Sequence, residues 1–195
     1  MTVDLIDSIL GVRPGDALDT IRAARPAARE NAQASYDALF TDIDEAAVSR
    51  TERHAVGYWT AALSGSQALA AHHQLALAEL DAALAEALAV EALAARTSGP
   101  TGSDPAGPLS VEDEPSVVWT ASDALAQVAT ARLIAALEHT HLLTFRPRDA
   151  NPDALQRLLD AGWSTTAIVS LSQLVSFTHF QLRVIAGLAV LKQEI

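Results

Sequence analysis

Residues 67–96 read QALAAHHQLALAELDAALAEALAVEALAAR, and this stretch decides the fold class. Alanine and leucine, both strong helix formers, dominate it, and it contains neither glycine nor proline. Its acids at Glu79, Asp81, Glu86 and Glu91 are most simply the solvated face of a long helix. Alanine makes up about a fifth of the whole chain, and we find no alternating strand pattern. We therefore predict an all-α fold.

Start and stop signals predict the remaining helices. Thr41-Asp42-Ile43-Asp44 has a hydroxyl followed three residues later by an acid, as at the N-terminus of a helix. Asn151-Pro152 places a capping side chain before a proline at the first helical position, and Ser164 caps a last long helix. The predicted helices cover residues 4–10, 27–40, 45–63, 67–96, 121–143, 152–162 and 164–191.

We predict a single all-helical domain over residues 1–195. A mobile loop over residues 97–118 separates an N-terminal half, 1–96, from a C-terminal half, 119–195. Half of the chain's eight prolines lie in this loop, which is also rich in glycine and serine.

Composition excludes several classes of function. The chain has no cysteine, so thiolate nucleophiles, disulfides and iron–sulfur clusters are impossible. A net charge of −11 argues against binding to nucleic acid or to an anionic membrane surface. We recognise no secretory signal and no window of about 18 uncharged apolar residues. We expect a cytoplasmic protein with no cofactor and no metal.

One group of polar residues could support acid–base chemistry. Glu52 and His54 precede a turn, and Ser66, His72 and His73 follow it. Ser66 and His73 are seven apart and share a helix face, and a hairpin of two helices could return Glu52 to a histidine. A carboxylate beside an imidazole is a workable proton relay. The alternative is that these are interfacial histidines and a helix cap.

A second group is Glu138-His139-Thr140-His141. Glu138 and His141 have the i, i+3 spacing of di-metal helical bundles, but such bundles need a second Glu-x-x-His motif, and the sequence has none. A metal-dependent helical enzyme is therefore a further alternative. Histidines near the C-terminus of a helix also interact favourably with its dipole.

Two stretches carry a family resemblance: residues 50–73, and the C-terminal part from Leu158 through Arg183 to Leu188. They resemble the carboxymuconolactone decarboxylase and alkylhydroperoxidase D-like superfamily, in its peroxidase-related branch. That family has a glutamate opening one helix, then a Cys-x-x-Cys at the start of the next and a histidine four residues on. The resemblance implies a helical bundle of the alkylhydroperoxidase D type.

The redox cysteines of this pattern are missing. Aligning on His73 puts Ser66 and Leu69 at the cysteine positions, whereas aligning on Glu52 with the family's usual spacing puts Ser64 and Gln67 there. We prefer the first alignment. Neither provides a thiolate to attack peroxide, and a serine does not cycle through a sulfenic acid.

The resemblance implies a homo-oligomer, a dimer, trimer or hexamer, that binds a small organic ligand or a partner without thiol peroxidase chemistry. The alternative is a cysteine-independent acid–base enzyme, a lactone decarboxylase or isomerase, that uses Glu52 and His73 with help from His54 or His72.

Overall fold

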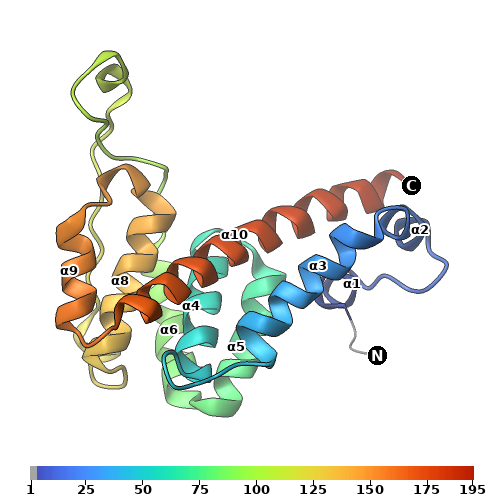
Figure 1. Cartoon of the computed structure of the whole chain (residues 1–195), viewed down its shortest axis with the longest axis horizontal. Helices are drawn as coiled ribbons and strands as arrows, with labels where there is room; N and C mark the ends of the chain where they lie inside the picture. The colour runs from blue at the N-terminus through green and yellow to red at the C-terminus, as the bar shows by residue number, and fades with distance from the viewer. Residues whose placement is uncertain (1–3) are drawn as a thin grey trace.

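The computed structural model describes residues 4–195 (Figure 1). It is 71% helical and these residues contain no strand, so the all-α prediction is confirmed. The finer expectation of an alkylhydroperoxidase D-like bundle stays a prediction.

The helices have the following bounds in chain order. They are α1 (Leu5–Leu10), α2 (Ala17–Ala23), α3 (Pro26–Tyr36), the π-helical turn η1 (Asp37–Thr41), α4 (Arg50–Leu63), α5 (Gln67–Leu80), α6 (Ala82–Ala95), the 3-10 turn η2 (Pro108–Glu112), α7 (Asp123–Ala126), α8 (Ala131–Phe145), the 3-10 turn η3 (Pro147–Asp149), α9 (Pro152–Asp160) and α10 (Thr165–Glu194).

The central helix is α4, which packs against α5, α6, α8 and α10. In Figure 1 helices α1 and α2 lie at one end of the molecule and α8 and α9 at the other. Helix α3 runs from the first end towards the middle, and α10 runs from one end to the other. Because α4 contacts elements of both predicted halves, the residues before and after the loop 97–118 are packed on one another.

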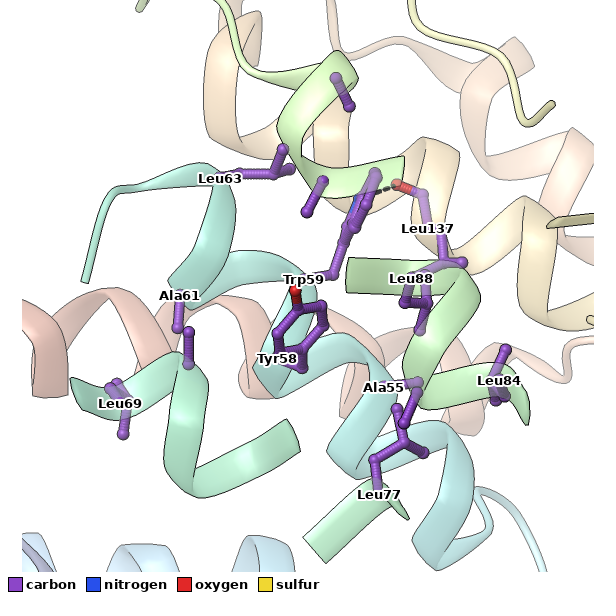
Figure 2. Close-up of a cluster of buried hydrophobic side chains, with 14 of the residues drawn as sticks. Ala55, Tyr58, Trp59, Ala61, Leu63, Leu69, Leu77, Leu84, Leu88 and Leu137 are labelled. Carbon is purple, nitrogen blue, oxygen red and sulfur yellow. Dashed lines mark hydrogen bonds between the residues drawn. The ribbon is translucent and has the colours of Figure 1, made fainter. Parts of the chain in front are cut away.

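The larger hydrophobic core is built around Trp59 on α4. Its side chain is fully buried, and its indole Nε1 donates to the carbonyl oxygen of Leu137 at 3.1 Å, which joins α4 to α8. Figure 2 shows Leu77 from α5 and Leu88 from α6 in the same cluster. The indole N–H is thus satisfied where water is excluded, as a buried tryptophan requires.

The predicted start of α4 is wrong. The helix begins at Arg50, five residues later than expected, because Ser49 is its N-cap. The Ser49 hydroxyl accepts from the backbone N–H of Glu52 at 3.2 Å, and the Glu52 carboxylate accepts from the backbone N–H of Ser49 at 2.9 Å. This capping box satisfies two backbone donors at once and outcompetes the Thr41 signal.

The helices predicted over 67–96 and 121–143 are each interrupted. At Asp81 the backbone is extended and the carboxylate accepts from the N–H of Leu84 at 3.0 Å, which ends α5 and starts α6. The hydroxyl of Thr130 starts α8 in the same way, accepting from Leu133 at 3.1 Å. Both side chains offer the backbone an alternative to a continuous helix.

The predicted loop over 97–118 protrudes from the helices (Figure 1). Thr101 donates its backbone N–H to the carbonyl of Phe145 at 2.7 Å, and Gly102 and Glu114 exchange two backbone hydrogen bonds of 3.0 and 3.2 Å. The turn η2 lies between these two residues. The segment therefore has ordered elements of its own and is closed at its base.

Helix α10 departs from one expectation. It contains an 18-residue window with a mean hydropathy of 1.6, so by length and composition alone it could cross a membrane. Only 28% of that window is buried inside the structure. Thr178 and Gln181 are nevertheless fully buried in the domain, and α10 packs on α1, α4 and α8. One face of α10 is therefore part of the protein core.

Candidate functional site

Three histidines meet between α4 and α5. Nδ1 of His54 and Nδ1 of His73 are 3.2 Å apart, so one ring must donate and the other accept. The hydroxyl of Tyr36, at the end of α3, lies 2.7 Å from Nε2 of His72. The structure thus brings together three of the five predicted site residues, with a tyrosine that was not among them. We call His54, His72, His73 and Tyr36 the histidine cluster.

Phe40 forms an aromatic wall of the histidine cluster. Its ring centroid lies 4.7 Å from that of His73 and 5.5 Å from that of His54. Phe40 belongs to the π-helical turn η1, a backbone form often found at functional sites. The Arg53 guanidinium holds this turn, donating to the carbonyl of Leu39 at 2.9 Å and to that of Val48 at 3.0 Å.

The histidine cluster is electrically neutral at pH 7. Burial lowers the pKa of His54 to about 4, with His72 and Arg50 contributing in the same direction. Burial also lowers the pKa of His72, and it lowers that of His73 well below 6.5. Burial raises the pKa of Tyr36 to about 12. Each group therefore serves as a neutral hydrogen-bonding partner, and none is poised to exchange a proton near pH 7.

His73 is fully enclosed. Its side chain has 0% exposure, and its Nε2 has no hydrogen-bond partner among residues 4–195. A Cβ added at Gly57 on α4 would lie 2.9–3.0 Å from three atoms of the ring. Gly57 lies within α4 and has no positive φ, so its backbone conformation does not require glycine. Glycine is needed here because the α4 backbone passes directly against the imidazole.

Glu52 does not join the histidine cluster. Its Oε1 accepts from Nε of Arg132 at 2.6 Å, and its Oε2 accepts from the backbone of Ser49. It forms no ion pair with a histidine of the described residues. The proposed pairing of Glu52 with His73 is therefore wrong: the carboxylate is used by the capping box and by an arginine from α8.

Ser66 also lies apart from His73. It is the N-cap of α5 but its hydroxyl makes no capping hydrogen bond, and no hydrogen bond joins it to the imidazole. Leu69, at the second cysteine position of the resemblance, has 0% exposure and belongs to the hydrophobic core. At this sequence position an apolar side chain therefore packs in the core.

Glu138 and His141 do not converge. Nε2 of His141 lies 3.1 Å from the carbonyl oxygen of Ala95, and its ring packs on Trp119 and Phe145. Glu138 instead lines a cavity of about 390 Å³. Among residues 4–195 no group of three or more His, Asp or Glu side chains is arranged to hold a metal ion. The Glu-x-x-His spacing is therefore used for packing and for a cavity wall.

Three arginines, none of them among the predicted site residues, lie next to the candidate residues. Arg132 lies beside Glu52, and Arg146 and Arg157 line the cavity that contains Glu138. The signal that could have found Arg132 is an arginine among apolar residues at the start of α8, because such a cation requires a carboxylate from another element.

No family model matches the sequence, and no curated protein is significantly similar to it. Membership of the alkylhydroperoxidase D-like superfamily is therefore a proposal.

The first prediction concerns Glu52. Glutamine also serves in a capping box, so Glu52→Gln removes only the charge opposite Arg132, whereas Glu52→Ala removes the cap as well. For this partly buried pair we expect Glu52→Gln to lower the free energy of unfolding by about 1–3 kcal/mol, and Glu52→Ala by about 1 kcal/mol more. Urea denaturation measures both.

The control is Glu45→Gln, which weakens the more exposed Glu45–Arg50 pair. It should cost less than about 0.5 kcal/mol. A Glu52→Gln protein as stable as the wild type would contradict the structural role of the carboxylate.

The second prediction concerns Gly57. Gly57→Ala should destabilise the protein by about 1–3 kcal/mol, because the new methyl group overlaps the enclosed His73 ring. Gly187→Ala is the matched control: Gly187 also lies within a helix, and its added Cβ would meet nothing within 4 Å. It should stabilise the protein by up to about 1 kcal/mol.

The same substitution in a His73→Ala background gives a decisive comparison. With the ring removed, the cost of Gly57→Ala should shrink or reverse. An equal cost in both backgrounds would show that Gly57 is needed for another reason.

The third prediction is a pH dependence. The folded histidines have lowered pKa values, so the unfolded chain binds more protons below about pH 6.5. Stability from these groups is full above that pH and is lost as the pH falls. The urea concentration at the unfolding midpoint should therefore decrease as the pH is lowered from about 7.5 to about 5. His54→Gln should make this dependence of the midpoint on pH shallower. A midpoint that stays flat or rises on acidification would contradict this.

Proposed function

We propose that this chain is a cysteine-free member of the alkylhydroperoxidase D-like superfamily that binds a small organic ligand and does not reduce peroxides. The observation that carries the proposal is the α4–α5 hairpin. Glu52 lies in the first turn of α4, Ser66 caps α5, and Leu69 and His73 follow on it, which is the order of the family's pattern with both thiols replaced.

The details of the hairpin support loss of the thiol reaction. Leu69 is part of the core, and the histidine at the family position is enclosed between Phe40, Gly57 and His54. A peroxidase needs its reactive group accessible to peroxide. Leu69 and His73 therefore stabilise the hairpin at the positions where the family has its redox centre.

The acid–base alternative has less support. It requires Glu52 as a free carboxylate beside His73, whereas Glu52 is engaged by Arg132 and Ser49. It also requires a histidine that titrates near neutral pH, and burial lowers the pKa of all three in the cluster.

The expected homo-oligomer stays a proposal. Two surface hollows border both α3 and α10. The hollow that includes Phe180 is also lined by residues of α1 and α2, and the hollow that includes Phe177 is also lined by residues of η1. Phe180 is 47% exposed. We propose this α3–α10 face as the contact between copies, because an apolar helix face left in water favours association.

The fourth prediction tests the absence of peroxidase chemistry. Purified protein with a dithiol reductant and hydrogen peroxide or an alkyl hydroperoxide should consume peroxide no faster than buffer does, because serine and leucine cannot be oxidised and recycled. Peroxide consumption is followed by absorbance, with catalase as the positive control. Turnover well above that of buffer would overturn the proposal, and its loss in Ser66→Ala would assign the activity to this hairpin.

A further inference from the structure

The cavity between α8, α9 and the segment before α7 lies outside the histidine cluster. Its volume is about 390 Å³, within the range of small-molecule sites. Charged and polar side chains from two helices line it: Glu138 and His139 from α8, Arg146 at the C-cap of α8, and Arg157 from α9. Apolar atoms complete the wall: Val118, Trp119, Ala135, Leu142 and Ala154.

Arg146 is a buried cation with an unused donor. The residue is 9% exposed, and its Nε has no hydrogen-bond partner among residues 4–195. Its only ion pair there is a long one, 3.4 Å from Nη1 to Oδ2 of Asp149. A buried guanidinium donor is costly to leave unpaired, so this atom points to a missing acceptor.

Arg157 supplies a second cation to the same cavity. It is exposed on α9 and forms no ion pair with a described residue. The Arg157 charge acts on two groups that line the cavity. Burial raises the pKa of Glu138, and Arg157 opposes this effect. Burial lowers the pKa of His139, and Arg157 lowers it further. Two guanidinium groups that face one cavity favour an anion.

The net charge limits which anion fits. Asp149 already offsets part of Arg146, and Glu138 lines the same cavity as the two cations. Counted as ionised, the two arginines and the two carboxylates sum to zero, so a monoanion adds one unbalanced negative charge whereas a dianion such as phosphate adds two. The apolar wall, with the Trp119 indole held by Glu91 at 3.0 Å, suits an organic body next to that charge.

We propose that this cavity is a binding site for a small organic monocarboxylate, whose carboxylate pairs with Arg146 and Arg157 and whose apolar body lies against Trp119. The site rests on the proposed function, since it supplies the ligand class for a protein that binds and does not turn over peroxide. Glu138 and His139 lie in the same wall, where they can accept hydrogen bonds from a hydroxyl group on the ligand.

Isothermal titration with a panel of acetate, benzoate, 3-phenylpropionate and 4-hydroxybenzoate tests the proposal. At least one aromatic acid should bind with a Kd of about 1 mM or tighter. Acetate should bind more weakly because it lacks the apolar body. Benzamide and inorganic phosphate, as the neutral and the doubly charged probes, should bind at least about tenfold more weakly than the best acid.

Arg157→Gln should weaken the best acid at least about tenfold while leaving the fold unchanged, because the side chain is exposed and unpaired. Arg183→Gln is the charge-matched control: this arginine is exposed, its one hydrogen bond within residues 4–195 goes to the carbonyl of His179 on its own helix, and it does not line the cavity. It should bind as the wild type does.

Several outcomes would overturn the site. These are no saturable binding by any acid of the panel, equal binding of benzoate and benzamide, equal or tighter binding of phosphate, or an Arg157→Gln protein that binds as tightly as the wild type. These failures are separate from that of the proposed function, because peroxide turnover would overturn the latter even if carboxylates bind here. Carboxylate failure without turnover would remove only this cavity as the ligand site.

Discussion

The rest of the structure depends on the ion pair between Arg132 and Glu52, which connects the start of α4 with α8 and with the turn between α9 and α10. The guanidinium donates to Glu52 at 2.6 Å, to the carbonyl of Gly162 at 2.6 Å and to that of Ala47 at 2.8 Å, and it lies 4.0 Å above the Trp163 ring. The same carboxylate closes the capping box of α4. One acid therefore fixes both where α4 begins and how α8 and the α9–α10 turn dock on it. Replacing either partner would leave a partly buried charge unpaired.

The position of α4 then determines the histidine cluster. With its first turn fixed, His54 faces His73 across the hairpin and Gly57 lets the imidazole lie against the helix backbone. The π-helical turn η1 closes the space with Phe40. Of the residues at the motif positions of the family resemblance, only His73 lies in this cluster, where it is fully buried. The cations available for a ligand lie elsewhere, on α9 and at the end of α8.

Much of the fold could be predicted because its signals are local. Gly11 ends α1, Asn151 and Pro152 start α9, and Ser164 caps α10, as their backbone preferences require. The breaks at Asp81 and Thr130 were missed, because each residue is neutral or weakly unfavourable in a helix and acts as a cap only when packing bends the chain there.

Some features of the candidate site could likewise be predicted from sequence, and others could not. The sequence by itself determined the helical class, the absence of thiol chemistry and the grouping of His54, His72 and His73 on consecutive helices, since composition and spacing suffice for these. Only the tertiary structure decided that Glu52 pairs with an arginine 80 residues away, and that Arg146 and Arg157 share a cavity. Such contacts join residues distant in sequence, and helical periodicity carries no information about which partner a buried charge will find.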